Sequence, residues 1–198
     1  MTANIATQRI GYRDAVARQP ESLENVRNSV TTALDGLDLS GFRGKAIGFA
    51  GIGASYQAAI AAAFFLRARG VRAYAYCSTD LYDAVDAAAD AFVALSASGQ
   101  SREIADVMQL RAKLPRIAIC RNGDNPLAKV AGAAIAYNSG ADNGASSTGY
   151  TGMLLAIGLL ADRILGGPSS ADWARLPAED GPPRTRSASS PMARSMPV

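Results

Sequence analysis

Three loops rich in hydroxyl groups and glycine hold the residues of this sequence that are best suited to chemistry. They are 51–56 "GIGASY", 96–101 "SASGQS" and 138–148 "NSGADNGASST". Each loop leads into a segment that resembles the start of a helix, where backbone N–H groups lack helical partners and carry positive partial charge. Neutral hydroxyls beside such groups can bind a phosphate without burying a competing charge, and glycine allows close approach to the backbone. The pattern therefore indicates a phosphate-binding site.

Each loop also has an ordinary structural interpretation. A serine before a helix often serves only as an N-cap, which fits Ser101. The "GIGAS" segment alone is weak evidence, and the 138–148 loop taken alone could be surface turn chemistry. Two hydroxyls that flank one turn, Ser96 and Ser98, exceed the needs of capping. Three such loops at strand–helix junctions of one sheet favour the binding-site interpretation.

Several kinds of chemistry are excluded by residues that the sequence lacks. The 198 residues include no histidine, which excludes histidine-based acid–base catalysis and histidine-ligated metals within one chain. Cys77 and Cys120 lie in or next to apolar runs, and we interpret them as buried free thiols rather than as zinc ligands. No GxxxxGK[ST] sequence is present, and the first loop lacks the third glycine of a dinucleotide-binding turn. We expect no metal and no cofactor.

The charge and hydropathy patterns limit the partners and the location. Much of the formal charge of +3 comes from three arginines after position 183, so we expect no nucleic-acid partner. No apolar secretory segment opens the chain. The most apolar stretch, 152–165, is interrupted by Asp162 and Arg163 and is too short to span a bilayer. We expect a cytoplasmic protein that does not enter a membrane.

Short apolar runs alternate with helical patterns along the chain. Strands are expected at 45–51, 71–77, 90–96, 116–122 and 133–138. Helices are expected at 8–35 (with a break or new start at Pro20), 55–70, 101–114, 125–131 and 147–165, with a short helix from 78 capped by Ser78 or Thr79. This alternation predicts a three-layer α-β-α sandwich around a five-stranded parallel sheet, of flavodoxin- or Rossmann-like type, with the strand order open. Ligands of such sheets bind beyond the carboxyl ends of the strands, where the three loops lie.

The domain organisation predicted from these patterns has three parts. Residues 1–40 form a helical segment that packs on the domain, and residues 41–166 form the domain itself. Residues 167–198 contain several prolines and no hydrophobic period, so we expect a disordered or loosely attached tail. The Arg/Pro/Ser/Ala composition of the tail also resembles an out-of-frame reading of a GC-rich gene.

Four segments taken together resemble the sugar isomerase (SIS) domain family. They are "GIGASY", "ALSASGQSRE", "AICRNGDNPLAKVA" and "GASSTGY". The helix "YRDAVARQPESLENV" resembles the Gln-Pro helix that precedes the isomerase half of glutamine–fructose-6-phosphate aminotransferase. The resemblance covers about residues 10–165 and is strongest to the first SIS domain of that enzyme and to AgaS-like sugar isomerases.

The resemblance implies a role for each loop. In this family a serine-rich SxSG loop holds the phosphate of a phosphosugar. The residues implied to contact the phosphate or the sugar, directly or through backbone access, are Gly53, Ser55, Ser96, Ser98, Gly99, Ser101 and Ser147. The sequence departs from the usual family residues at four positions, Ala54, Ala97, Gln100 and Gly149.

The activity implied is that of the aldose–ketose isomerase or aminosugar-phosphate isomerase-deaminase class, acting on a hexose or hexosamine 6-phosphate. The family's acid–base residues come from a second SIS domain and the tail beyond it. Glu103 is the carboxylate nearest the serine loop, but its helical position predicts that it faces solvent, so it is a weak catalytic candidate. The alternative is a catalytically silent phosphosugar sensor, or a truncated half of a two-domain enzyme. The apolar surfaces of helices 55–70 and 147–165 suggest a homodimer or a higher homo-oligomer.

Overall fold

Five short apolar segments form one parallel sheet in the computed structural model, which describes residues 9–83 and 88–167. The strands are β1 (Ile47–Gly51), β2 (Ala73–Cys77), β3 (Ala91–Leu95), β4 (Arg116–Cys120) and β5 (Ala133–Ala136). Their order across the sheet is β2-β1-β3-β4-β5, and every neighbouring pair is parallel. Both faces of the sheet are covered by helices, which is why β1 and β3 are continuous apolar runs. The predicted α/β sandwich with a five-stranded parallel sheet is confirmed.

The helices lie close to the positions that the periodicity predicts. They are α1 (Tyr12–Ala17), α2 (Gln19–Asp35), α3 (Ala54–Arg67), α4 (Arg102–Leu110), α5 (Pro126–Val130) and α6 (Thr148–Ile164). The predicted helix 8–35 is two helices that meet at Arg18, with Pro20 in the first turn of α2. The spacing of apolar residues in 8–35 predicts that Val16 lies on one buried stripe with Leu23 and Val26, but Val16 is 38% exposed and Ala15 is buried instead. That expectation was wrong because α1 ends at Ala17, so the stripe of α2 does not set its buried face.

The short helix after β2 differs from the prediction in its cap. It is a 3₁₀ turn, η2 (Ser78–Leu81), and Cys77 occupies its N-cap position without a side-chain cap bond. The expectation that Ser78 or Thr79 would be the cap was therefore wrong. The strand runs directly into the turn, so its last residue takes the cap position. Residues 84–87 of the predicted segment lie outside the described residues.

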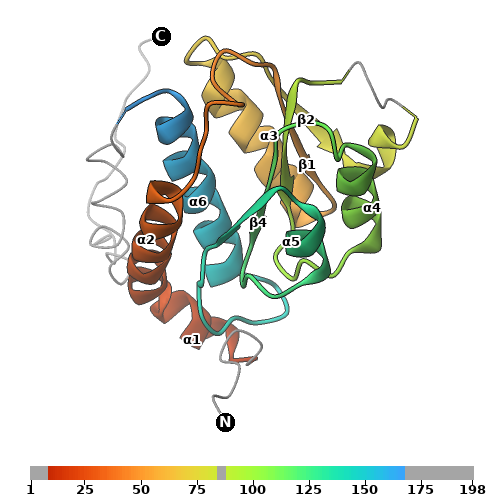
Figure 1. Cartoon of the computed structure of the whole chain (residues 1–198). Coiled ribbons are helices and arrows are strands. Elements are labelled where there is room, and N and C mark those ends of the chain that lie inside the picture. Colours follow the sequence, from red (N-terminus) through yellow and green to blue (C-terminus); the bar gives the residue numbers. More distant parts are fainter. Residues whose placement is uncertain (1–8, 84–87, 168–198) are drawn as a thin grey trace, which may run out of the picture.

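The helices form two outer layers. Helices α2, α3 and α6 cover one face of the sheet, and α4, α5 and η2 cover the other (Figure 1). Strand side chains alternate between two apolar clusters: Phe49 and Val93 pack on the first face, and Phe92 and Ala94 pack on the second. In the first cluster, Val26 of α2 is fully buried.

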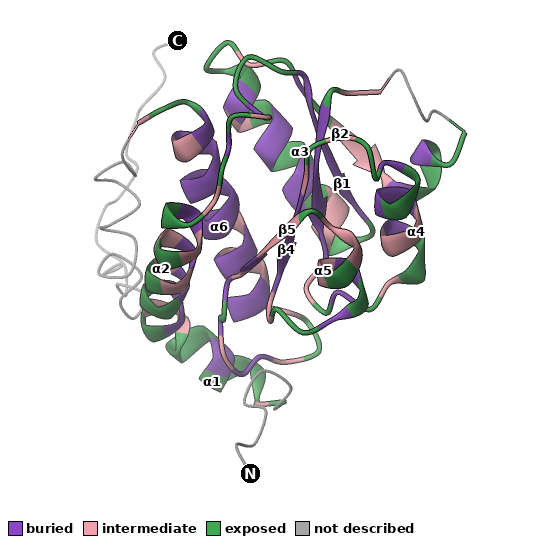
Figure 2. Cartoon of the chain, viewed as in Figure 1, coloured by how far each residue is buried: buried purple, intermediate pink, exposed green. Residues whose placement is uncertain are grey.

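Helix α6 lies between α2 and the sheet and is buried along almost its whole length (Figure 2). Its long apolar sequence is thus explained by packing within the chain, mainly against α2 and α3. The apolar surface of α6 therefore gives no reason to expect a homodimer. On α3, Ile60 and Phe64 remain 40% and 70% exposed.

The remaining expectations on organisation have mixed outcomes. Cys77 and Cys120 are both free, but only Cys120 is buried. Residues 168–198, almost the whole predicted tail, lie outside the described residues, and the boundaries 1–40 and 41–166 stay predictions. Within residues 9–83 and 88–167, no helix is long and apolar enough to cross a membrane.

Candidate phosphate-binding site

The strand order brings two of the three predicted loops together. The chain passes from β1 to β2 on one side and then returns to β3 on the other side of β1. At such a point the loops after the two strands diverge, and ligands of open parallel sheets bind between them. Here these loops are 52–53, which leads into α3, and 96–101, which leads into α4.

The loop after β1 makes a close turn into α3. A Cβ atom on Gly51 would lie 2.6 Å from the Ser55 carbonyl carbon, so only glycine allows this approach. Gly53 has φ +57° and occupies the N-cap of α3, which has no side-chain cap bond. The half-buried Ser55 lies in the first turn, and its backbone N–H donates to the Ile52 carbonyl at 3.1 Å.

The loop after β3 is held by its own serines. The buried Ser96 Oγ accepts a hydrogen bond from the Gly99 N–H at 3.0 Å, and the exposed Ser98 Oγ accepts one from the Gln100 N–H at 3.2 Å. A hydroxyl that accepts keeps its own proton for donation. Both serines can therefore shape the loop and still donate to a ligand.

The start of α4 is open. Ser101 occupies the N-cap position with extended backbone, but its side chain makes no capping bond. The expected N-cap position of Ser101 is therefore confirmed, but the side-chain capping bond expected with it is not formed. The first N–H groups of α4 need acceptors, and the described residues supply no side-chain cap for them. An anionic ligand would supply those acceptors.

Asn125 is a supporting residue that the sequence reasoning missed. It is 1% exposed, its Oδ1 accepts from the Ala128 N–H at 2.8 Å, and it caps the N-terminus of α5. A Cβ atom on Gly99, which has φ +65°, would lie 2.1 Å from this Oδ1. The Leu127 N–H also donates to the Gly99 carbonyl at 3.1 Å. Helix α5 therefore holds the serine loop in place, and the Asn-Pro dipeptide at 125–126 was the only local sign of it.

In the third predicted loop, two backbone donors at the start of α6 are already paired within the chain. The carboxylate of Asp142, which is 3% exposed, accepts from the Ser147 N–H at 2.8 Å and from the Gly149 N–H at 2.9 Å. It also accepts from the Ser146 hydroxyl at 3.1 Å. The expectation that loop 138–148 presents free N–H groups to a phosphate was therefore wrong at these positions, because the chain supplies its own anion there.

Ser147 keeps a side chain that a ligand can use. It lies at the N-cap of α6 and is 7% exposed, and its Oγ has no hydrogen-bond partner among the described residues. A buried hydroxyl without a partner is costly, so a ligand group or a water is expected to pair with it. Glu103, by contrast, is exposed in the first turn of α4.

Arg121 connects the serine loop to the start of α6. Its backbone N–H donates to the Ala97 carbonyl at 3.0 Å, and its carbonyl accepts from the Asn138 N–H at 2.9 Å. Its guanidinium lies 3.3 Å from the Asp142 carboxylate. One residue at the carboxyl end of β4 therefore contacts both loops.

The surroundings of Asp142 set its protonation. Burial raises the pKa of this carboxyl, but the N–H groups of Ser147, Asn143 and Gly149 and the Ser146 hydroxyl outweigh that effect. The net result is a pKa below the ordinary value of the group. Asp142 is therefore a carboxylate at neutral pH.

A pH dependence of stability follows from this lowered pKa. Because the pKa is lower in the folded than in the unfolded chain, the carboxylate contributes stability above the unfolded value of about 3.9, and this contribution is lost as the pH falls through the folded value. Tyr137, which also faces this site, does not titrate there, since burial raises the pKa of Tyr137 to about 12. Urea unfolding from pH 7 to pH 2 should show wild type losing its advantage over Asp142→Asn below about pH 4. A constant difference would contradict this assignment.

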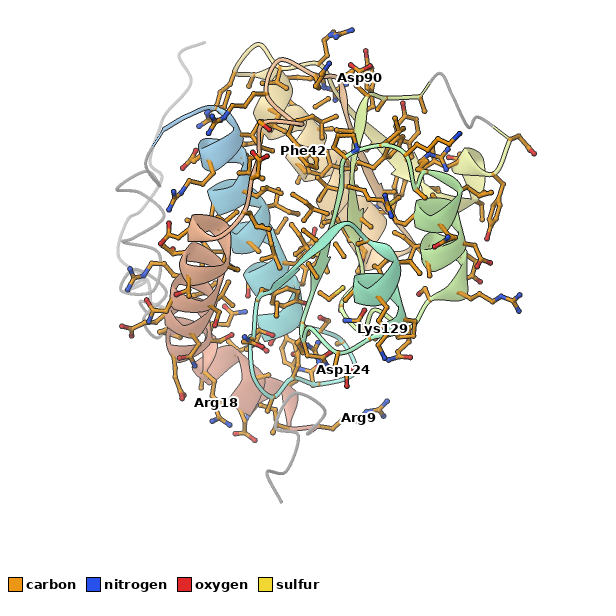
Figure 3. The ribbon with its side chains drawn as sticks, viewed as in Figure 1. Arg9, Arg18, Phe42, Asp90, Asp124 and Lys129 are labelled. Carbon is orange, nitrogen blue, oxygen red and sulfur yellow. The ribbon has the colours of Figure 1, made fainter. Side chains whose placement is uncertain are left out.

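A separate cavity opens at the opposite, amino edge of the sheet. Its volume is about 720 Å³, and its lining includes Lys45, Asp90 and Pro115. In Figure 3, Asp90 lies at the amino end of β3, whereas Asp124 and Lys129 lie at the other end of the molecule, near the carboxyl ends of the strands. The cavity is therefore remote from the serine loop. Within the part of the chain that the structure describes, no cluster of three or more His, Cys, Asp or Glu residues could hold a metal ion.

The sequence matches no protein-family model and no curated protein. Solved structures nevertheless share its fold. A candidate phosphosugar isomerase from Silicibacter pomeroyi DSS-3 has 17% identity and a TM-score of 0.66, covering 85% of this chain and 55% of that one. The C-terminal domain of glucosamine-fructose-6-phosphate aminotransferase from Francisella tularensis has 20% identity and a TM-score of 0.66, covering 85% and 52%.

A third structure contains a sugar phosphate. It is the Vibrio vulnificus NanR protein complexed with ManNAc-6P, with 18% identity and a TM-score of 0.56, covering 80% of this chain and 66% of that one. The chain thus spans about half of the first two structures and about two thirds of the third. The resemblance read from the sequence is confirmed at the level of the fold, and the chain has the fold of phosphosugar isomerase (SIS) domains.

Proposed function

We propose that this chain binds a phosphosugar, a hexose or hexosamine 6-phosphate, between the loops that follow β1 and β3. The observation that carries the proposal is the start of α4, which has no side-chain cap and lies beside the hydroxyls of Ser96 and Ser98. A phosphate accepts hydrogen bonds from such N–H groups and is favoured by the helix dipole. Structures of the same fold that are named for a phosphosugar or contain ManNAc-6P support this choice.

The other residues proposed to line the site have complementary roles. Gly53 and Gly99 allow the ligand to approach the backbone. Ser55 adds a hydroxyl from the first turn of α3, and Ser101 adds one from the N-cap of α4. The unpartnered Ser147 Oγ pairs with a sugar hydroxyl. The phosphate thus lies on α4, and the rest of the sugar extends toward the start of α6.

The reaction that we propose for the complete site is aldose–ketose isomerisation or the related aminosugar-phosphate chemistry. Moving a proton between C1 and C2 requires a positioned acid–base group. The sequence contains no histidine, and Glu103 is exposed. The missing group would come from a second domain or subunit. The same observation favours the second candidate, a phosphosugar sensor that binds without turnover.

Location and assembly belong to the same proposal. We place the protein in the cytoplasm, where phosphosugars are made and used, and we propose a homodimer that covers Ile60 and Phe64 of α3. An exposed aromatic beside an exposed isoleucine is a usual feature of such contacts. Light scattering of the purified chain should give twice the mass of a monomer. The Phe64→Asp variant should give the mass of a single monomer.

Binding should be visible as thermal stabilisation. Fructose 6-phosphate or glucosamine 6-phosphate at about 100 times its Kd should raise the melting temperature by roughly 5–11 °C, since a ligand that binds only the folded state stabilises it. Ser98→Ala should abolish the rise, because it removes a donor of the loop. Ser40→Ala, which removes an equally exposed serine far along the chain, should keep it.

The outcomes separate the two candidates. No shift in wild type with any hexose phosphate would overturn both. The isomerase is supported if the shift is accompanied by conversion of fructose 6-phosphate to an aldose phosphate, measured with a coupled assay. A shift without conversion supports the sensor, or an isomerase half whose acid–base group lies in a second domain or subunit that the assay does not contain.

A further inference from the structure

The N-terminus of α6 carries an anion that belongs to the chain itself. The Asp142 Oδ1 atom accepts from the Asn143 and Ser147 N–H groups at 2.9 and 2.8 Å, and its Oδ2 accepts from Gly149 at 2.9 Å. A carboxylate in this position takes the place that a phosphate takes at other helix starts. Two N–H groups at the start of α6, those of Ser147 and Gly149, are therefore already paired.

The space at this helix start is also filled. A Cβ atom on Gly149 would lie 2.5 Å from the Arg121 guanidinium and 2.6 Å from the Asp142 carboxylate. Arg121 itself pairs with Asp142 at 3.3 Å, so the nearby positive charge is offset. A second anion would meet a like charge that neither titrates near neutral pH nor can move aside cheaply.

In the proposed site the phosphate lies at the start of α4 and the sugar extends toward the start of α6, and these two helix starts differ in charge. The start of α4 has no side-chain cap, whereas the start of α6 has Asp142. Arg121 joins them, with its backbone on the serine loop and its side chain on Asp142. At the α6 end, the Ser147 Oγ and the Asn143 Nδ2, both neutral, are buried side-chain groups without a hydrogen-bond partner among the described residues. One end of the site thus suits a phosphate, and the other suits a neutral hydroxyl.

We infer that Asp142 is a specificity-determining residue, a built-in anion that restricts this site to sugars with a single phosphate and rejects bisphosphates. The inference rests on the proposed function, since it assigns the two ends of the same ligand. It goes further by naming the residue that excludes a second phosphate.

Isothermal titration of the wild-type chain at fixed ionic strength tests the selectivity directly. Fructose 6-phosphate should bind at least about tenfold more tightly than fructose 1,6-bisphosphate, and Asp142→Ala should reduce the ratio to about threefold or less. Equal binding of the two sugars by wild type overturns the inference and leaves the proposed function standing. Failure of both sugars to bind overturns the proposed function and the selectivity with it.

A rescue experiment covers the case in which Asp142→Ala is unstable. Formate should raise the melting temperature of Asp142→Ala by several degrees above that in equimolar sodium chloride, because the small carboxylate can replace the missing one. Wild type should show no such rise, and neither should Asp38→Ala, whose lost carboxylate is exposed and accepts from Ser40. Two results would contradict the assignment of Asp142 as a built-in anion. One is that formate does not stabilise Asp142→Ala, and the other is that formate stabilises wild type equally.

Discussion

Replacing Gly99 by alanine should destabilise the protein by about 3 kcal/mol and abolish phosphosugar binding. At φ +65° a Cβ atom costs roughly 1–2 kcal/mol, and forcing an extra methyl into a packed site costs a further 1–3 kcal/mol. The methyl would lie 2.1 Å from Asn125 Oδ1, which is buried and caps α5. For a folded unit of this size, the melting temperature should fall by roughly 6–12 °C.

Gly44→Ala is the matched control for Gly99→Ala. Gly44 has φ +70°, but nothing lies within 4 Å of the position its Cβ would take. The Gly44→Ala variant therefore has the backbone strain of a positive φ without a steric clash like that between residue 99 and Asn125. Gly44 also lies far from the serine loop. Urea unfolding and phosphosugar titration of both variants make the comparison. If Gly99→Ala were no less stable than Gly44→Ala and still bound the sugar, Asn125 would not be the support of the loop.

Asp142→Ala should be the second severe substitution, lowering the free energy of unfolding by about 3 kcal/mol at pH 7. Removing one partner of a buried ion pair is strongly destabilising, and here it also removes the carboxylate that accepts from the Ser147 and Gly149 N–H groups. The carboxylate is 2% exposed, while the Arg121 side chain is 19% exposed, which places the cost at the lower end of the range for buried pairs. Chemical denaturation at pH 7 measures it.

The chain offers a control with the same ion-pair distance. Asp124 and Lys129 also lie 3.3 Å apart, but their side chains are 94% and 72% exposed (Figure 3). Exposed pairs contribute little, because water screens them and both side chains lose freedom. Asp124→Ala should therefore unfold at the same urea concentration as wild type. A similar loss in both variants would show that burial at Asp142 is not the cause.

Local patterns in the sequence predicted most of the elements and the identity of the main loop. Strand and helix periods depend on residues close together in the chain, so β3, the serine loop and α4 were all expected near their observed positions. The crowding of Ser96, Ser98 and Gly99 pointed to a phosphate for the same reason. The absence of histidine follows from composition alone, and it excludes histidine-based acid–base catalysis within the chain whatever the fold.

Contacts between distant residues decided what the local patterns left open. Strand order depends on pairings such as β1 with β3, which are more than 40 residues apart, and that pairing places the loops after β1 and β3 side by side. The contact of Gly99 with Asn125 depends on α5 packing beside α4. No local pattern contains this information.

Competition for hydrogen bonds decided the third loop. By itself the sequence determined that the start of α6 would be rich in donors, because glycine, serine and threonine precede an apolar helix there. Only the tertiary structure decided that Asp142 pairs with those donors and that Ser101, placed as a cap, does not cap α4. The physical reason is that an N–H group bonds the acceptor that the folded backbone brings within reach, and that choice depends on dihedral angles and packing rather than on spacing along the chain.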